Sequence, residues 1–368
     1  MYFEIRIEDI NAALAYTIGV VEKRSTLPIL GFFLLRADED TLEIVSTDLE
    51  IEIQARTRAD VQTPGACVIP GRKLFDICRS LPKETVLKVR AEKDKASLSA
   101  GRSRFALLTL AEQDYPRLTV TGADNEMEIE VETLRHLIDK TAFAMAQQDV
   151  RYYLNGMLFA RTPEKMIGVT TDGHRLSKIE IATEAPAGAE TEVIVPGKAV
   201  QELKRILASL PRDGRIRMTF GEGLLGLSID DIVFHTKLID AKYPDYERVI
   251  PQNLTKRAVI DKEQLRNALM RMSTISYDKY KGVEFIFEDG TLRLVSKNTE
   301  QEIAEEDFDI TYEGANTSIA FNSSYVVDVL NAVTTEAIEL SFVDGDTSAI
   351  WRGEGCPEET YVIMPMRL

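Results

Sequence analysis

Apolar and polar positions along the chain repeat three times, about 125 residues apart. The clearest repeats are strand-like segments rich in apolar residues: TLEIVSTD at 41–48, KMIGVTTD at 165–172 and TLRLVSKN at 291–298. Such short apolar runs, bounded by turn-forming residues, are typical of β-strands. The sequence therefore predicts three copies of one structural unit.

Each copy also contains two stretches with the apolar spacing of an amphipathic helix. In the later helix of the first copy, Leu74, Ile77 and Leu81 recur at i, i+3 and i+7, and the other copies repeat this stripe. The six predicted helical stretches are 9–24, 70–82, 132–148, 196–211, 261–272 and 322–333. Because alternating strands surround them, the pattern predicts an α+β fold with two helices packed on antiparallel sheets in every unit.

Polar or proline-containing segments separate the copies near residues 120 and 252. The predicted domains are therefore 1–120, 121–251 and 252–368. A chain of 368 residues is long enough for two or three domains of ordinary size. The repeat alone leaves open whether the domains close into a larger assembly or form a simple string.

The net charge of −16 argues against tight binding to nucleic acid when it is taken alone. The charge is unevenly distributed, however, because the six helical stretches together are net basic and the rest of the chain carries the acidic excess. The basic candidates are Lys73, Arg79, Lys198, Lys204 and Arg205. These side chains either attract a polyanion without reading its sequence or lie on ordinary solvated helix faces.

Cysteines and hydropathy indicate the cellular compartment. Cys67, Cys78 and Cys356 are widely separated and lack CxxC spacing, so neither a disulfide framework nor a zinc site is expected. No apolar run approaches the roughly 20 residues that span a bilayer, and the first residues alternate like a strand. We expect a cytoplasmic protein with buried thiols.

The candidate for an enzyme site is TDGHRL at 171–176, where Asp172 and His174 flank a glycine. His136 lies in a predicted helix and His235 in a predicted strand, so neither has metal-ligand spacing with His174. The chain contains no phosphate-binding loop, no G-x-S-x-G and no H-E-x-x-H motif. We therefore expect no catalysis, no metal and no cofactor, while a metal-dependent enzyme using Asp172 and His174 remains the alternative.

Several segments together closely resemble the bacterial sliding clamps, the beta subunits of DNA polymerase III. The most specific segments are TLPILGFFLL, STDLEIE, PGRKLFDICRSLP, GRSRFALLTL, QQDVRYYLNGMLF, TTDGHRL, YPDYERVIP and the terminal YVIMPMRL. The resemblance runs from end to end.

The resemblance implies a noncatalytic processivity subunit of a DNA polymerase that acts in DNA replication. In this family three clamp domains per chain form a six-domain ring as a head-to-tail homodimer, with helices lining the hole. Such a ring slides on double-stranded DNA without sequence specificity, which answers the objection from the acidic net charge. A peptide-binding scaffold that does not bind DNA is a further alternative.

The resemblance also implies two kinds of contact residue. The positions that match DNA-contacting residues are Arg24, Arg72, Gln148, Tyr152, Tyr153 and Lys198. Arg24 and Gln148 are expected to end their helices, and the alternative for the two tyrosines is partial burial in a strand at 151–154. Short hydrophobic peptides of the replicative polymerase, the clamp loader and repair or translesion polymerases are expected to bind a pocket lined by Leu154, Thr171, Gly173, His174, Arg175, Leu176, Pro244, Arg248, Val249, Ser348, Val362, Met364, Pro365, Met366 and Arg367. Arg175 and Arg248 would frame its rim.

The implied dimer contact combines apolar and charged side chains. Phe105 and Leu107 are expected to meet Ile275 of the other chain. The charged positions are Lys73, Lys95, Arg102 and Arg104, which would face Glu300, Glu302, Glu305 and Glu306. Thr274 and Ile303 depart from the family pattern, which often has an aliphatic and an acidic residue at these two places.

Overall fold

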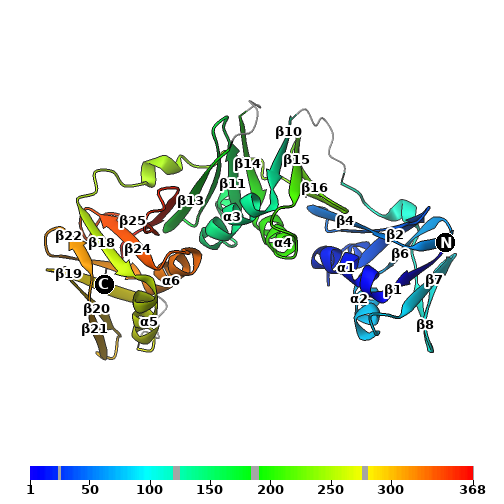
Figure 1. Cartoon of the computed structure of the whole chain (residues 1–368), viewed down its shortest axis with the longest axis horizontal. Helices are drawn as coiled ribbons and strands as arrows, with labels where there is room; N and C mark the ends of the chain where they lie inside the picture. The colour runs from blue at the N-terminus through cyan, green and yellow to red at the C-terminus, as the bar shows by residue number, and fades with distance from the viewer. Residues whose placement is uncertain (24–25, 119–124, 184–189, 276–280, 368) are drawn as a thin grey trace. The chain divides into compact units, whose positions relative to one another are not determined.

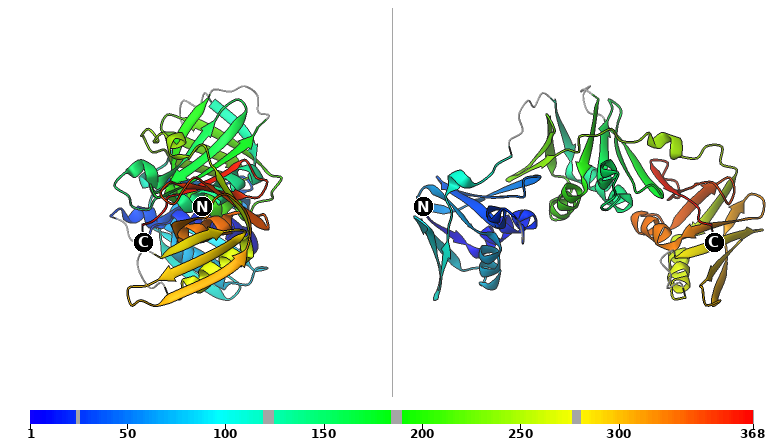
Figure 2. Two further views of the ribbon diagram at one scale, coloured as in Figure 1. Left: turned by 90° about the vertical axis from the view of Figure 1, so that its left-hand side faces the viewer. Right: turned by 180° about the vertical axis from the view of Figure 1, so that it is seen from behind.

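The computed structural model describes residues 1–23, 26–118, 125–183, 190–275 and 281–367. These residues form two compact units, one made of Met1–Leu134 with Gln201–Leu238 and the other of Arg135–Val200 with Ile239–Leu368. Both units consist of antiparallel sheets with helices packed against them (Figures 1 and 2). The predicted α+β composition is confirmed.

The first unit contains two sheets. The five-stranded sheet has the order β5 (Asp60–Thr63), β1 (Tyr2–Arg6), β7 (Val86–Glu92), β8 (Lys95–Ala100) and β9 (Ser103–Leu108). The eight-stranded sheet has the order β10 (Asn125–Glu130), β15 (Arg215–Gly221), β16 (Leu224–Ile229), β17 (Ile232–Lys237), β4 (Ile51–Arg58), β3 (Thr41–Thr47), β2 (Phe32–Asp38) and β6 (Gly65–Pro70). Strands from the first and second sequence repeats therefore join into one sheet where β4 pairs with β17.

Helices α1 (Ile7–Thr17) and α2 (Gly71–Ser80) lie side by side against these sheets (Figure 1). The apolar stripe that the sequence shows is buried, since Leu14 of α1 and Leu74 of α2 share one core with Phe33. Cys67 and Cys78 lie in the same core, and burial raises the pKa of each thiol to about 12. Cys356 is partly buried, and all three cysteines are free thiols.

The second unit also contains two sheets. The nine-stranded sheet has the order β14 (Thr191–Pro196), β11 (Gly156–Arg161), β12 (Lys165–Thr171), β13 (Arg175–Ala182), β26 (Glu359–Ile363), β25 (Ala349–Gly353), β24 (Ala337–Phe342), β18 (Lys256–Asp261) and β22 (Thr311–Glu313). The four-stranded sheet has the order β21 (Ile303–Asp309), β20 (Thr291–Lys297), β19 (Gly282–Glu288) and β23 (Thr317–Asn322). Here the second and third sequence repeats join through the pairing of β13 with β26.

Helices α5 (Lys262–Met272) and α6 (Ser323–Ala332) pack side by side in this unit (Figure 2). Both begin with a side-chain cap: Asp261 accepts a hydrogen bond from the backbone N–H of Gln264, and Asn322 accepts one from that of Ser324. Helices α3 (Val131–Thr141) and α4 (Gly197–Leu207) complete the set, so each of the six predicted stretches contains a helix.

Several local predictions are wrong or fall outside the described residues. The first helix ends at Thr17 and continues as the 3-10 turn η1 (Ile18–Val20), and α3 ends at Thr141, followed by η4 (Ala142–Ala144). Gln148 therefore does not end a helix but lies in a loop with a φ of 55°. Arg24 and the predicted boundary at residue 120 lie outside the described residues.

The expected strand at 151–154 is instead the 3-10 turn η5 (Tyr152–Asn155). The side chain of Asn155 accepts a hydrogen bond from the Asp149 N–H at 2.9 Å and donates one to the Asp149 carbonyl at 2.8 Å. These two bonds close the loop between residues 149 and 155, which an extended strand would not allow. Local side-chain bonding therefore replaces the strand.

Candidate functional site

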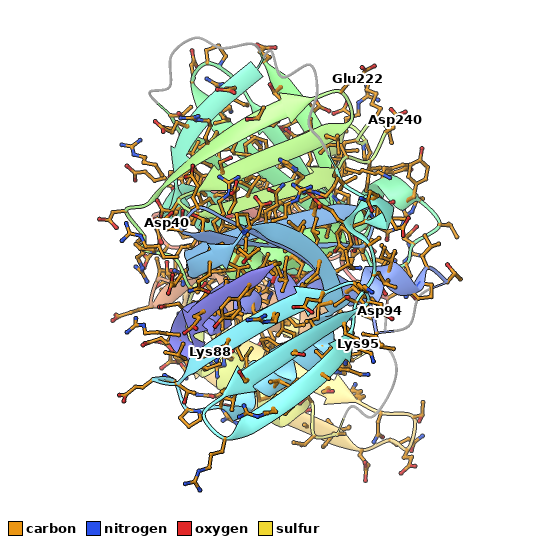
Figure 3. All side chains as sticks on the ribbon, turned by 90° about the vertical axis from the view of Figure 1, so that its right-hand side faces the viewer. Asp40, Lys88, Asp94, Lys95, Glu222 and Asp240 are labelled. Carbon is orange, nitrogen blue, oxygen red and sulfur yellow. The ribbon has the colours of Figure 1, made fainter. Side chains whose placement is uncertain are left out.

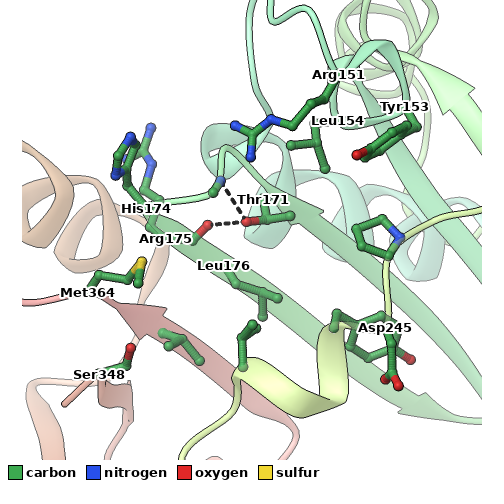
Figure 4. A pocket seen from close by; sticks show the side chains of 15 residues that line it. Arg151, Tyr153, Leu154, Thr171, His174, Arg175, Leu176, Asp245, Ser348 and Met364 are labelled. Atoms are coloured by element: carbon green, nitrogen blue, oxygen red, sulfur yellow. Dashed lines mark hydrogen bonds between the residues drawn. The ribbon is translucent and has the colours of Figure 1, made fainter.

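A cavity of about 290 Å³ opens in the second unit where the ends of several elements meet (Figure 4). Its walls come from β12, β13, β26, η5 and the 3-10 turn η6 (Tyr246–Val249). The residues that line it are Arg151, Tyr153, Leu154, Thr171, Gly173, His174, Arg175, Leu176, Pro244, Asp245, Tyr246, Val249, Ser348, Val362 and Met364. An apolar cavity with a few polar groups is typical of ligand-binding sites.

The floor of the cavity is apolar because of strand register. Leu176 of β13 lies opposite Val362 of β26, and Val362 lies opposite Ile350 of β25. Directly opposed residues project to the same face of a sheet, so these three side chains pack together. They belong to one buried cluster with Leu154 and Tyr243. The floor is therefore preformed by the core of the unit.

The turn from Thr171 to Arg175 shapes the mouth of the cavity. The Thr171 hydroxyl donates to the Arg175 carbonyl at 2.6 Å and accepts from the Gly173 N–H at 3.1 Å (Figure 4). One oxygen of Asp172 accepts from the backbone N–H groups of His174 and Arg175, at 2.9 and 3.0 Å. The Asp172 carboxylate therefore holds the turn, as expected of a structural residue rather than of a catalytic partner for His174.

Arg175 is fixed on all sides. Its guanidinium donates to Asp172 at 3.0 Å, to Asp328 of α6 at 2.5 Å and to the Phe143 carbonyl at 2.7 Å. The same group lies 4.4 Å from the centre of the Tyr325 ring. Its side chain is only 12% exposed, so Arg175 joins β13 to α6 while it lines the cavity.

Arg151 supports the turn from the other side of the mouth. Its guanidinium is paired with Asp149 at 2.8 Å and donates to the Asp172 carbonyl at 3.1 Å. The hydrogen bonds from Arg151 lower the pKa of Asp149 to about 2. Gly173 has a φ of +89°, and a Cβ there would lie 2.9 Å from the Arg151 guanidinium. Glycine therefore avoids both backbone strain and displacement of the Arg151 side chain at this position.

The chain matches family models of a known protein along nearly its whole length. Three family models match in order: the N-terminal domain of the DNA polymerase III beta subunit at residues 1–121, its central domain at 128–245 and its C-terminal domain at 247–367. The chain belongs to the DNA polymerase III beta subunit family. This family is the processivity clamp of the polymerase in DNA replication and is not itself catalytic.

Relatives and solved structures agree with this assignment. The beta sliding clamp of Pseudomonas aeruginosa is 40% identical and that of Escherichia coli K12 is 39% identical, each over 100% of both chains. The crystal structure of the Pseudomonas aeruginosa clamp bound to griselimycin matches with a TM-score of 0.97 over 100% of both chains, at 40% identity. The Caulobacter crescentus beta subunit matches with a TM-score of 0.94 over 100% of both chains, at 31% identity. The three-clamp-domain fold is thereby confirmed.

Most of the residues that the sequence assigned to a peptide pocket of this clamp surround the one cavity. Arg248, Pro365, Met366 and Arg367 lie outside its lining. Arg248 is 84% exposed and pairs with Asp245, and the Met366 N–H donates to Ala320 of β23. The sequence missed Arg151, Tyr153, Asp245 and Tyr246, although all four lie inside segments that resemble the family.

The predicted DNA-contacting residues occupy different surroundings. Tyr152 is 57% exposed, whereas Tyr153 lines the cavity and packs edge-on against Tyr152. Gln148 and Lys198 are exposed, and the first turn of α4 contacts the loop that ends at Asn155. Arg72 in the first unit is partly buried against the Val21 carbonyl. Tyr153 thus contributes to the cavity wall, while Tyr152 is the more exposed of the two tyrosines.

Part of the predicted dimer set lies on two edge strands, β9 with Arg104, Phe105 and Leu107 and β21 with Glu305 and Glu306. Lys73 lies on α2, and the residues outside helices and strands are Arg102, Ile275, Glu300 and Glu302. Phe105 and Leu107 are half-buried on β9, the last strand of its sheet, and Lys95 begins the neighbouring β8 (Figure 3). Glu305 and Glu306 lie on β21, which is likewise an edge strand. Glu306 already pairs with Arg271, and Glu302 accepts from the Asn298 side chain at 2.6 Å. Leu108 of β9 and Ile303 of β21 are 66% and 52% exposed.

Among the residues that the structure describes, no group of three or more His, Cys, Asp or Glu side chains could hold a metal ion. No helix within the described ranges is long and apolar enough to cross a membrane.

Proposed function

We propose that two copies of this clamp close head to tail into a ring that encircles duplex DNA and tethers a replicative polymerase to it. The full-length match to all three domains of the clamp family carries the proposal. A closed ring is retained by topology and needs only weak electrostatic attraction to DNA. The net charge of −16 is therefore compatible with the function.

The edge strands β9 and β21 are proposed to pair between the two copies. Edge strands carry backbone groups that a second chain can satisfy. Arg102 and Arg104 give the β9 edge a basic character, while Glu305 and Asp307 make β21 acidic. Exposed ion pairs contribute about 0–1 kcal/mol each, so the apolar contacts of Phe105 and Leu107 with Ile275 should dominate. The exposed Leu108 and Ile303 add apolar surface to the same edges.

Contact with DNA is proposed for the positions that the resemblance supplies: Arg24, Arg72, Gln148, Tyr152, Tyr153 and Lys198. The exposure of Gln148, Tyr152 and Lys198 supports this role for the part of the set that lies in the second unit. Such contacts bind phosphate without reading sequence, so they should weaken as salt rises.

The cavity is the proposed docking site for short hydrophobic peptides of the polymerase, the clamp loader and repair or translesion polymerases. Leu176 and Val362 offer a fixed apolar floor, while Met364 is 49% exposed and can adapt its shape to different side chains. We also propose that griselimycin, which is bound in the structure of the Pseudomonas aeruginosa relative, occupies this cavity. The protein would act in the cytoplasm, without a metal or cofactor, with domains at 1–120, 121–251 and 252–368.

Retention on circular DNA tests the proposal. The clamp would be loaded on nicked circular DNA by a clamp loader, at a salt concentration that suppresses simple electrostatic binding, and the circle would then be cut. Retention that is lost on linearisation supports encirclement. If the protein never stays on the circle although a control clamp does, the ring proposal fails.

A further inference from the structure

One wall of the cavity is the segment from Pro244 to Val249, which contains the short 3-10 turn η6 and forms no strand or α-helix. Within the described residues, the backbone hydrogen bonds recorded between this connection and the sheets lie near its ends, where Ile239 donates to Ile194 at 2.9 Å and Thr255 donates to Phe342 at 3.2 Å. Between these ends the recorded backbone bonds are local, such as that from Ile250 to Glu247. Side chains must therefore hold the wall in place.

Lys178 of β13 makes a polar connection to this wall. Its Nζ lies 2.6 Å from a carboxylate oxygen of Glu247 in η6 and 3.2 Å from Glu180. The same Nζ lies 5.6 Å from the centre of the Tyr246 ring. Tyr246 lines the cavity, so the cation touches both neighbouring residues of the wall.

Strand geometry places Lys178 directly beside the cavity floor. Residues two apart in a strand project to the same face, so Lys178 follows Leu176 on one face of β13. The Lys178 side chain is only 11% exposed. Burial alone would lower the pKa of Lys178, but the hydrogen bonds with Glu247 and Glu180 outweigh it and raise the pKa. Lys178 is therefore a charged, nearly buried residue that needs its carboxylate partners.

We propose that Lys178 and Glu247 are positioning residues of the peptide cavity. Their ion pair holds η6 against β13, so that Tyr246 and Val249 form a wall before any ligand arrives. A preformed wall saves the ligand the entropic cost of ordering it, so affinity depends on the pair although neither charged group needs to touch the ligand. This inference rests on the proposed function of the cavity.

The test is a double-mutant cycle with griselimycin as the probe. Glu247→Gln removes the charge of a side chain that is 56% exposed, and Lys178→Met replaces the lysine by an apolar chain of similar length. Dissociation constants would be measured by calorimetry for the wild type, both single variants and the double variant. We expect each single variant to bind about fivefold more weakly, and the double variant to be no weaker than either single one.

Lys165→Gln provides the matched control. Lys165 pairs with Glu180 at 2.6 Å and belongs to the same charged cluster, but it lies on β12 and its ion pair connects β12 to β13. Its loss should leave griselimycin affinity within experimental error. Hydrogen exchange of the unliganded proteins adds a second readout, because the amides of residues 245–250 should exchange faster in Glu247→Gln and not in Lys165→Gln.

Failure of this inference differs from failure of the proposed function. If the wild type does not bind griselimycin, or if Leu176→Ala binds it as tightly as the wild type, the cavity is not the docking site and both ideas fall. If the wild type binds, Leu176→Ala weakens binding and Glu247→Gln changes neither affinity nor exchange, only the positioning role is overturned. Additive losses in the double variant would also overturn it.

Discussion

The two places where a sheet continues from one sequence repeat into the next have the same backbone plan but different surfaces. In the second unit, Leu176 of β13 faces Val362 of β26, and Ile350 lies opposite Val362 on the next strand. In the first unit, Glu52 of β4 faces His235 of β17, and Gly226 lies opposite His235. A Tyr-Pro pair follows in both connections, at 115–116 and 243–244.

The polar junction of the first unit is covered by its own chain. Glu52 is fully buried and accepts hydrogen bonds from the Arg117 guanidinium at 3.1 Å and the Leu118 N–H at 2.8 Å. The His235 ring nitrogen lies 3.2 Å from the Leu118 carbonyl. The N–H and the carbonyl of Leu118 therefore both hold the connecting segment against the pair of strands β4 and β17.

At the apolar junction of the second unit, Leu176 and Val362 take the places of the glutamate and the histidine. Its connecting segment forms a wall of the cavity and leaves these two side chains accessible from the cavity. The same fold thus yields a covered junction or an open ligand site, according to whether two opposed strand positions are Glu and His or Leu and Val. Substitutions at the polar junction and at the apolar junction can both test this difference.

Removal of Glu52 should have the largest effect. Glu52→Ala leaves the partly buried Arg117 and the Leu118 N–H without their acceptor, and breaking a buried ion pair costs about 3 kcal/mol or more. Urea unfolding of the first unit should show this loss. Glu50→Ala is the control, because Glu50 is 61% exposed and 3.6 Å from Lys237, so its loss should cost below about 0.5 kcal/mol. Equal losses would show that Glu52 does not hold the connection.

Truncation of the apolar floor should have the next largest effect. Leu176→Ala removes an anchor surface at the centre of the cavity, and griselimycin should bind about 2 kcal/mol more weakly, or roughly 30-fold in Kd. Leu34→Ala removes an equally buried leucine from the first unit and should destabilise that unit without changing affinity. An unchanged affinity in Leu176→Ala would separate the cavity from ligand binding.

The contrast between the junctions also shows which features a sequence reveals. The repeats and helices are predictable because their signal is local periodicity, as in Leu74, Ile77 and Leu81. The buried position of Glu52 cannot be predicted in this way, because a glutamate between Ile51 and Ile53 has the pattern of a solvent-facing strand position. Its partner Arg117 is also 65 residues away in the sequence. The bond between Arg175 and Asp328 is equally unpredictable, because Asp328 lies 153 residues further along the chain.

The wrong prediction that Gln148 ends a helix has a different origin. The segment after Thr141 continues the helical pattern of apolar residues, which explains why Gln148 was expected at a helix end. The helix ends earlier, and Gln148 takes a positive φ that no periodicity predicts. The pocket residues came from the resemblance, and no pattern within this one sequence would have brought residues 154, 176 and 362 together.

The stability of the polar junction should also depend on pH, with a smaller effect than the two substitutions above. Burial lowers the pKa of His235 below its usual value, so the unfolded chain binds more protons than the folded one as the pH falls through about 6.5. The neutral imidazole therefore contributes stability that is present above that pH and is lost below it. The first unit should lose stability between pH 7.5 and 5.5, and His235→Gln should lose less. An identical loss in both proteins would exclude His235 as the cause.

Substitutions in the turns that precede the two junctions should have the smallest effect on stability. Gly173 at the mouth of the cavity has its counterpart in Leu49 of the first repeat, and both have positive φ, at 89° and 75°. A leucine in this conformation is strained, whereas glycine is not, and the strain is about 1 kcal/mol. Leu49→Gly should therefore stabilise the first unit, by no more than about 0.5–1 kcal/mol because glycine also raises the entropy of the unfolded chain. Gly173→Ala should do the opposite, since its Cβ would also press on Arg151. Thermal unfolding of both variants measures the pair, and destabilisation by Leu49→Gly would mean that the Leu49 side chain contributes more packing energy than its backbone strain costs.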